Sequence, residues 1–288
     1  MALCKGRFHH AALDQGVRMF QVRETPLLSC RNVTKKFGSL AAVSELSFDL
    51  AAGEVLGIGG PNGAGKTTLF EMISGQTAVT SGTIALEGRD ITGLSPVGRC
   101  HAGLARVFQL NTGFDSLSVR ENVLVAAYYG RAPRRIPGFR VPSEVSDQVQ
   151  DALCRVGLEA SADRAAAKLP VIDRKLLMIA GALAMSPKLL LLDEPVGGLT
   201  QREIDQVADV VGQVAADGVT VVLIEHVMRF LVQLSTRVMI LHHGRKLYEG
   251  DAAGISRDPD VVEVYLGQSA GKDVARLAAD RTEARHAG

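Results

Sequence analysis

The segment from Gly60 to Thr67, Gly-Pro-Asn-Gly-Ala-Gly-Lys-Thr, constrains the fold and chemistry of this sequence more than any other feature. It has the pattern G-x-x-x-x-G-K-[ST], in which glycines let successive backbone N–H groups converge on phosphate oxygens. A helix that begins directly after the glycines adds partial positive charge. The Lys66 ammonium can reach the β- and γ-phosphates, and the Thr67 hydroxyl can hold Mg²⁺. We predict a nucleotide-binding loop made of Asn62, Gly63, Ala64, Gly65, Lys66, Thr67 and Thr68.

The residues on either side of this loop favour a strand before it and a helix after it. The run from Glu54 to Ile58 is typical of a strand, and a helix is predicted from about Gly65 to about Ser74. A Gly-rich turn that carries a lysine by chance is the alternative. The strand–loop–helix context favours the phosphate-binding interpretation.

A second candidate site lies at the end of an apolar run, Leu189-Leu-Leu-Leu-Asp193-Glu194. A buried parallel strand has this pattern, and ligands of open α/β sheets bind at the carboxyl ends of the strands. Asp193 is suited to holding Mg²⁺ through water, and Glu194 is suited to polarising an attacking water. A solvated acidic turn is the alternative, but a phosphate loop upstream favours the catalytic interpretation.

Strands and helices alternate along most of the chain, which indicates an α/β domain with a largely parallel sheet. Further strands are expected at residues 46–50, 104–109, 188–192 and 219–224, with a closing pair at 238–241 and 246–248. A helix should present Ile204, Val207, Val211 and Val214 on one face. From about 110 to 186 the pattern is helical and forms an insert, interrupted by a loop from Gly130 to Pro142.

The bulk composition excludes several classes of protein. The 288 residues carry a formal net charge of +1, so the whole chain has no field of the kind that binds nucleic acid. No apolar run approaches the roughly 20 residues needed to cross a bilayer, and the first 25 residues lack the apolar stretch of a signal peptide. The four cysteines are too far apart to suggest a zinc site. A link to a membrane would therefore run through a partner protein.

With these motifs in place, the sequence resembles the ATP-binding subunits of ABC transporters. The resemblance covers about residues 27–267 and is carried by Phe37–Gly75, 104–109, 189–200 and 223–226. It implies a P-loop NTPase fold of the ABC ATPase type, with a largely parallel sheet core, an antiparallel β subdomain and an inserted helical subdomain at about 110–186. The domain would span 26–267, between a disordered leader at 1–25 and a C-terminal tail at 268–288.

Within that superfamily, the sequence is most similar to the subunits of branched-chain amino-acid importers. Three details carry this: the Ala-Arg-x-Phe-Gln form that ends at Gln109, the Ile-Glu-His sequence at 224–226, and the closing Val-Glu-Val-Tyr-Leu-Gly at 262–267. The resemblance implies an ATP-hydrolysing motor of such an importer, with ATP and Mg²⁺ as cofactors. A motor of a lipid or lipopolysaccharide exporter, and a soluble nucleotide-dependent regulator with little turnover, are the alternatives.

The resemblance also implies roles for single residues. Phe37 corresponds to an aromatic that stacks on adenine, with a buried core phenylalanine as the alternative. Gln109 corresponds to a glutamine that contacts Mg²⁺ and the attacking water, in a segment that signals to the membrane subunit. His226 corresponds to a switch histidine near the γ-phosphate, with a structural histidine as the alternative. Residues 197–200 would face a second nucleotide-binding subunit.

One motif departs from the family pattern, which has a signature near Leu-Ser-Gly-Gly-Gln before the acidic strand. The matching residues here are Leu169-Pro-Val-Ile-Asp173, followed by Arg174 and Lys175. The resemblance implies that the Ser hydroxyl and the Gly N–H groups contact the γ-phosphate bound by the opposite subunit. Pro170 offers neither group. The two apolar residues after it crowd a close approach, and the Asp173 anion repels phosphate unless the two cations compensate. Either the trans contribution is weakened, or the remaining N–H groups still serve.

The implied partners follow from this interpretation. We expect a second ABC ATPase subunit, as a homodimer or a heterodimer, together with transmembrane permease subunits. A periplasmic or extracellular solute-binding protein would act indirectly, and no nucleic acid is expected. The chain would lie at the cytoplasmic face of the inner (plasma) membrane as a peripheral subunit, with the helical insert and the Gln109 segment against the permease.

Overall fold

Two β-sheets frame the molecule in the computed structural model, which describes residues 25–109, 113–130, 141–255 and 257–266. The larger sheet has the strand order β10-β9-β3-β8-β7-β6. All of its neighbouring strands are parallel except β10, which pairs with β9 in the antiparallel sense. Its strands are β3 (Val55–Gly59), β6 (Leu104–Val107), β7 (Leu189–Asp193), β8 (Thr220–Ile224), β9 (Arg237–His242) and β10 (Arg245–Gly250).

The smaller sheet has four strands in the order β2-β1-β4-β5, and each pair is antiparallel. One face is buried, as the alternating apolar residues predict, because side chains alternate between the two faces of a strand. Its strands are β1 (Leu28–Phe37), β2 (Leu40–Leu50), β4 (Ser81–Leu86) and β5 (Arg89–Asp90).

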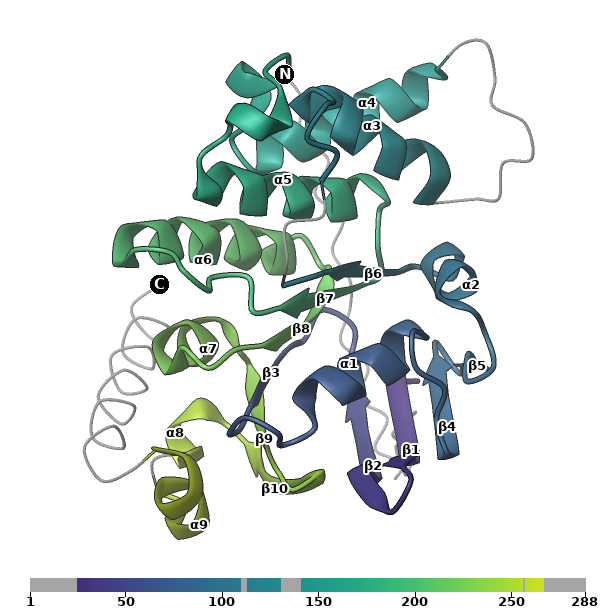
Figure 1. The fold of residues 1–288 in the computed structure, drawn as a ribbon, viewed down its shortest axis with the longest axis vertical. Coiled ribbons are helices and arrows are strands. Elements are labelled where there is room, and N and C mark those ends of the chain that lie inside the picture. The colour runs from purple at the N-terminus through teal and green to yellow at the C-terminus, as the bar shows by residue number, and fades with distance from the viewer. Residues whose placement is uncertain (1–24, 110–112, 131–140, 256, 267–288) are drawn as a thin grey trace, which may run out of the picture.

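The helices cover both faces of the larger sheet and continue into a separate group at one end (Figure 1). The α-helices are α1 (Lys66–Ser74), α2 (Pro96–His101), α3 (Val119–Gly130), α4 (Ser143–Arg155), α5 (Val171–Ala184), α6 (Gln201–Ala216), α7 (Met228–Leu234), α8 (Ala252–Ile255) and α9 (Pro259–Val261). The short 3-10 turns are η1 (Glu159–Ser161) and η2 (Ala166–Lys168), and η3 (Val262–Leu266) has π-helical bonding. No described helix is long and apolar enough to cross a membrane.

The core divides along the larger sheet, because successive residues of a buried strand face opposite sides. In β7, Leu190 and Leu192 pack into the cluster that includes α5 and α6. Leu189 and Leu191 pack into the cluster that includes α1 and the smaller sheet. A strand buried on both faces therefore carries the acidic pair Asp193-Glu194 between two packed layers.

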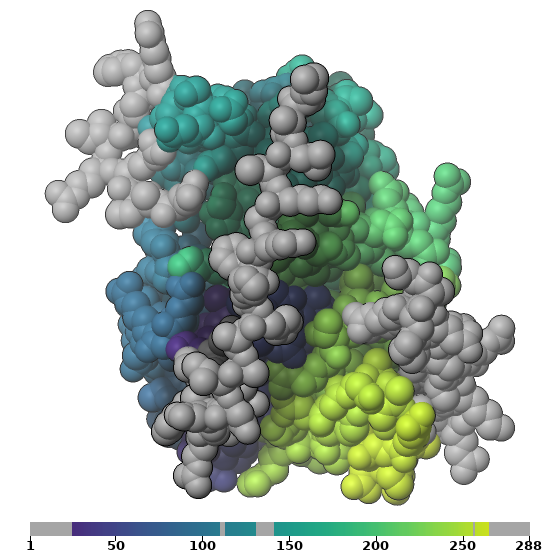
Figure 2. All heavy atoms as spheres, turned by 180° about the vertical axis from the view of Figure 1, so that it is seen from behind, coloured from purple at the N-terminus to yellow at the C-terminus, as the bar shows by residue number. Residues whose placement is uncertain are grey.

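The helices between β6 and β7 form a group of their own, which meets the larger sheet through α5. Figure 1 shows α3, α4 and α5 at one end of the molecule, and Figure 2 shows the same teal region at the opposite end from the yellow C-terminal elements. In α4, Val145, Val149, Ala152 and Leu153 form the buried stripe, as an amphipathic helix requires. This group corresponds in position to the helical insert predicted at about 110–186.

The structure confirms the predicted fold class, a largely parallel core with an antiparallel sheet beside it. The strand predicted at 104–109 is shorter: its last paired residue is Val107, opposite Leu192, and the chain then leaves the sheet so that Gln109 reaches Glu194. The predicted leader at 1–25 and tail at 268–288 lie outside the described residues apart from Thr25, as does most of the loop predicted from Gly130 to Pro142.

A buried arginine fixes the helix that follows the phosphate loop. Arg99 is 1% exposed. Its guanidinium donates to the carbonyl oxygens of Met72 and Ile73 at the end of α1, and to that of Thr92 at 2.7 Å. Burial lowers the pKa of this guanidinium. The terminal carbonyls of a helix lack partners within it, so this arginine supplies donors that α1 needs at its buried end.

Candidate nucleotide site

The phosphate loop folds as the glycine pattern predicts. It leaves β3, turns through Gly60 and Gly63, and enters α1 at Gly65, all with positive φ (140°, 78° and 99°). Glycine is the residue that adopts such angles without strain. A Cβ at Gly65 would lie 2.3 Å from the carbonyl oxygen of Ala42 on β2, which excludes a side chain there. The smaller sheet therefore holds the loop in place.

Lys66 is buried and bends back over the loop. Its Nζ donates to the carbonyl oxygens of Gly60 at 2.7 Å and of Pro61 at 3.0 Å. Burial lowers the pKa of the ammonium, whereas the nearby charges of Glu194 and Asp193 raise it. The lysine, the loop and both acidic residues therefore share one electrostatic environment. Asn62, Gly63 and Thr67 are exposed, Gly65 and Thr68 are half-buried, and Ala64 is buried.

The two acidic residues at the end of β7 make different contacts. Asp193 is 5% exposed and forms a 2.7 Å ion pair with Arg106 of β6. Glu194 has a left-handed backbone with φ 47°, which is strained for a residue with a side chain. Strain of this kind gathers at functional sites, because the surrounding structure must hold it in place.

Glu194 brings the two other predicted catalytic residues together. Its Oε2 accepts a 2.6 Å hydrogen bond from the Nε2 of Gln109, and its Oε1 lies 3.7 Å from the Nδ1 of His226. These residues follow three parallel strands, β6, β7 and β8, whose carboxyl ends meet at one edge of the sheet. The sequence motifs, 85 residues apart in the case of Gln109 and Glu194, thus form one cluster.

Phe37 lies at the end of β1 and is 52% exposed, so it is not the buried core residue of the alternative interpretation. The Lys35 ammonium sits 4.9 Å from the centre of its ring. A cation near this distance is attracted to the electron-rich face of an aromatic ring. An exposed ring of this kind can also stack on a base.

Two residues at the site were missed by reasoning from the sequence. Arg106 also donates to Ser74 Oγ and Gln76 Oε1, which ties β6 to the end of α1. Glu225 is fully buried directly after β8. In each case the signal was a charged residue inside or at the end of an apolar strand, where a charge is costly unless it is paired.

The segment that departs from the family signature forms the start of α5. Pro170 is the N-cap residue and makes no side-chain capping bond, Val171 is 53% exposed, and Asp173 lies in the first turn. The two cations considered as compensation differ in their surroundings. Arg174 donates to the carbonyl oxygens of Ala167 and Leu169. Lys175 is buried, which lowers the pKa of its ammonium, whereas the charges of Glu225 and Glu194 raise it.

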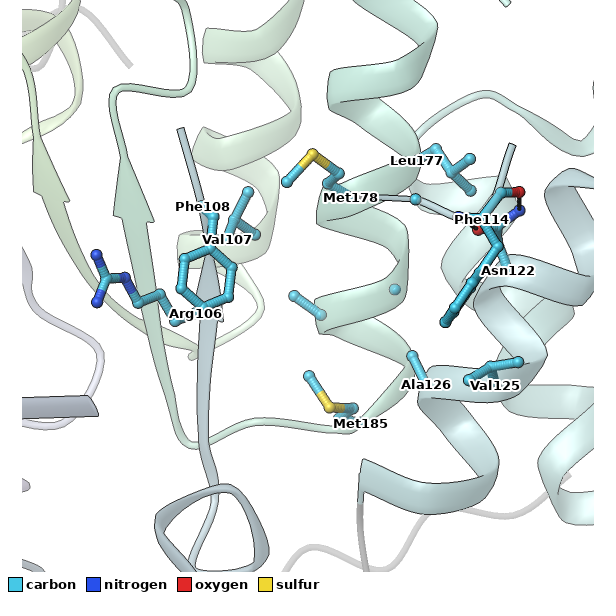
Figure 3. A pocket seen from close by; sticks show the side chains of 13 residues that line it. Arg106, Val107, Phe108, Phe114, Asn122, Val125, Ala126, Leu177, Met178 and Met185 are labelled. Carbon is cyan, nitrogen blue, oxygen red and sulfur yellow. Dashed lines mark hydrogen bonds between the residues drawn. The ribbon is translucent and has the colours of Figure 1, made fainter. Parts of the chain in front are cut away.

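A largely apolar cavity of about 210 Å³ lies beside the site. One wall is the end of β6, and the other is formed by α3 and the residues before it. Figure 3 shows Met178 of α5 and Met185, which directly follows α5, between Phe108 on one side and Ala126 on the other. The exposed Phe114 also lines it. The cavity therefore connects the Gln109 segment to the helical group.

Comparison with known proteins gives consistent matches. Residues 43–197 match the family described as ABC transporter. The chain is similar to the high-affinity branched-chain amino acid transport ATP-binding protein LivG of Salmonella typhimurium, with 34% identity over 85% of this chain and 99% of that protein. It is similar to BraF, of the same description, from Pseudomonas aeruginosa, with 32% identity and the same coverage.

Solved structures give the same picture. The ADP conformation of an ATP-binding cassette from an ABC transporter has a TM-score of 0.77 and 28% identity, and the match covers 84% of this chain and 99% of that one. A nucleotide-free cassette has a TM-score of 0.76 and 29% identity, with 84% and 100% coverage.

Proposed function

Because this chain belongs to the ABC transporter family and is an ATP-hydrolysing subunit of that class, we propose that it powers the import of branched-chain or related amino acids. Its relatives LivG and BraF are described as high-affinity branched-chain amino acid transport ATP-binding proteins, and the matches cover 99% of each. The observation that carries the ATP-driven part of the proposal is the cluster at Glu194, whose carboxylate meets Gln109 and His226 beside the phosphate loop. The class of transported molecule is proposed from these relatives.

In the proposed reaction, Phe37 stacks on adenine, and Lys66 and the loop N–H groups hold the triphosphate. Glu194 accepts a proton from water as the water oxygen bonds to the γ-phosphorus. The bond from that phosphorus to the bridging oxygen breaks, and ADP leaves with the electron pair. Gln109 and His226, on the two oxygens of Glu194, orient the water and contact the γ-phosphate.

The residues present fit a magnesium ion. Thr67, Gln109 and Asp193 offer hard oxygen donors, and Mg²⁺ uses few protein ligands together with substrate phosphates. The described residues hold no group of three or more His, Cys, Asp or Glu side chains suited to a metal. When bound, the ion neutralises charge on the β- and γ-phosphate oxygens.

The proposed assembly pairs two ATP-binding subunits across the nucleotide, with the loop at 197–200 facing the partner. The cavity between β6, α3 and α5 would receive a segment of the permease, because its apolar lining and exposed Phe114 need a cover. The Gln109 segment forms part of the same wall, so docking and hydrolysis would be coupled there. This arrangement places the chain at the cytoplasmic face of the membrane, peripherally, with a solute-binding protein acting from the other side.

Reconstitution in lipid vesicles tests the proposal. We expect the chain, together with permease subunits and a solute-binding protein of this importer type, to drive ATP-dependent uptake of radiolabelled leucine. Glu194→Gln should slow both ATP turnover and uptake at least ~10²-fold, the scale of losing a general base. Ribose in place of leucine is the matched control. Transport of ribose alone, export of a lipid, or turnover with no coupled transport would each contradict it.

A further inference from the structure

The buried carboxylate of Glu225 joins two segments that border the hydrolytic cluster. Glu225 directly follows β8 and has no exposed surface. Its Oε1 accepts a hydrogen bond from the backbone N–H of Val196, in the loop after β7, at 3.1 Å. Its Oε2 accepts from the N–H groups of His226 and Val227, at 3.2 and 3.3 Å. One side chain thus holds the loop after β7 and the loop after β8 at a fixed separation.

Packing alone does not explain a carboxylate at this buried position. Burial raises the pKa of this carboxyl, and the three N–H donors and the nearby His226 act against that rise. An apolar side chain of similar size would fill the same space without burying a charge. A buried carboxylate whose oxygens are hydrogen-bonded can, by contrast, fix one geometry of the segments that it joins.

A buried cation lies in the same electrostatic environment. Burial lowers the pKa of Lys175, in the first half of α5, whereas the charges of Glu225 and Glu194 raise it. The Nδ1 of His226 lies 4.0 Å from Glu225 and 3.7 Å from Glu194, so the histidine sits between the two acids.

We propose that Glu225 is a positioning residue for ATP hydrolysis, which sets His226 and the loop at 196–200 relative to Glu194. This inference rests on the proposed function of Glu194. Glu194 itself is hydrogen-bonded to the neighbouring strand, since its N–H donates to the carbonyl oxygen of Ile224. The backbone of Glu194 and the loop at 196–200 are therefore both held by hydrogen bonds to residues 224 and 225. A displacement of about 1 Å in such an arrangement can cost 10²-fold in rate.

The variant Glu225→Gln tests this with little change of shape. An amide has one acceptor oxygen, whereas the carboxylate has two, so one of the two loops loses its acceptor whichever way the amide turns. We expect kcat for ATP to fall about 10- to 100-fold. The KM and the Kd for ATP should stay within about twofold, because the phosphate loop is untouched. A general loss of structure would instead change binding and turnover together.

Glu54→Gln is the matched control. Glu54 is also a largely buried carboxylate, with a side chain 16% exposed, and it pairs with Arg237 away from the site. It should lower the melting temperature without lowering kcat. If Glu225→Gln does not fold, Glu225→Asp keeps both oxygens but is one methylene too short to hold both loops, and the same split between kcat and KM is expected.

Hydrogen exchange gives a second readout. The peptides that contain Val196 and His226–Val227 should lose protection in Glu225→Gln and keep it in Glu54→Gln. A kcat within twofold of wild type for Glu225→Gln, or an equal loss in both variants, would overturn the inference. Glu194→Gln separates the two proposals. If that variant is slow while Glu225→Gln is fast, only the positioning role fails; if Glu194→Gln is fast, the proposed function fails.

Discussion

The starts of α1 and α5 are both helix N-termini that the family pattern directs toward phosphate, yet they are built differently. The first follows a glycine with φ 99°, has no acidic residue in its first turn, and has Lys66 at its opening. The second follows Pro170 and carries Asp173 in its first turn; its Arg174 donates to a backbone carbonyl oxygen, and its Lys175 is buried. From this difference we predict that this chain keeps its own nucleotide site complete and contributes less to the site of a partner; the alternative is that the remaining N–H groups of α5 still serve.

The largest effect should come from Lys66→Ala, at the start of α1. We expect the ammonium to contact two phosphates, and each hydrogen bond to a charged group contributes about 1.5–3 kcal/mol. Losing both should weaken ATP binding by about 10²- to 10⁴-fold. Titration with ATP by calorimetry measures this. Lys35→Ala, at an exposed position near Phe37, is the control for simple loss of charge. Undiminished ATP affinity in Lys66→Ala would show that the start of α1 does not hold the phosphates, and the contrast with the start of α5 would then have no basis.

A somewhat smaller effect should follow from Arg106→Met, which leaves Asp193 buried without its cation. Breaking a buried pair costs about 3–5 kcal/mol of stability. The exposed pair Arg120–Asp163 of the helical group, with side chains 44% and 88% exposed, should contribute about 0–1 kcal/mol. Urea unfolding of Arg106→Met and Arg120→Met compares them. Mg²⁺ with ATP should restore part of the loss in the first variant, and equal losses in both would show that Asp193 is not held by Arg106.

The third effect tests the altered segment at the start of α5 directly. Restoring Ser-Gly-Gly-Gln at residues 170–173 should raise the ATPase rate of the self-paired chain by up to about 10²- to 10³-fold, the value of an ideal oxyanion donor. Two glycines in the first turns of α5 cost about 1 kcal/mol each in stability, so binding and melting are measured alongside.

The control for this restoration is Val171→Ala with Ile172→Ala, which removes bulk without supplying the hydroxyl or the glycine backbone. It should not raise the rate. Fast turnover by the unmodified chain alone would show that both of its sites use the altered segment without penalty, and the contrast between the two helix starts would then have no functional meaning.

The smallest effect should come from removing both ends. A chain of residues 20–270 keeps every element of both helix starts, so its Kd for ATP should equal that of the full chain within about twofold. Fluorescence titration with a labelled ATP compares the two chains. A folded 20–270 chain that cannot bind ATP would show that residues outside this range are required for the nucleotide site.

The sequence predicts the parts of the site that depend on local geometry. A glycine pattern determines the phosphate loop, and an apolar run with two acids determines the end of β7, because each needs only neighbouring residues. The partners of Arg106 and Glu225 could not be predicted in this way. Arg106 meets Asp193 across 87 residues, and Glu225 meets Val196 across 29. These pairs depend on which strands lie side by side, and that order is set by packing of the whole sheet.

The central place of β3 also has a consequence for the chain as it is being made. Ile58, next to the phosphate loop, lies between Ile224 of β8 and Met239 of β9. The strand that leads into the loop therefore has no neighbour in its sheet until β8 has been made, and it has both neighbours only after β9. At roughly 5–20 residues per second, that is a wait of about 10–40 s for an apolar segment that invites aggregation and chaperone binding. A ribosome-held chain that stops at residue 218 should bind no ATP, and one released after residue 267 should bind it, as measured by photo-crosslinking to an azido-ATP.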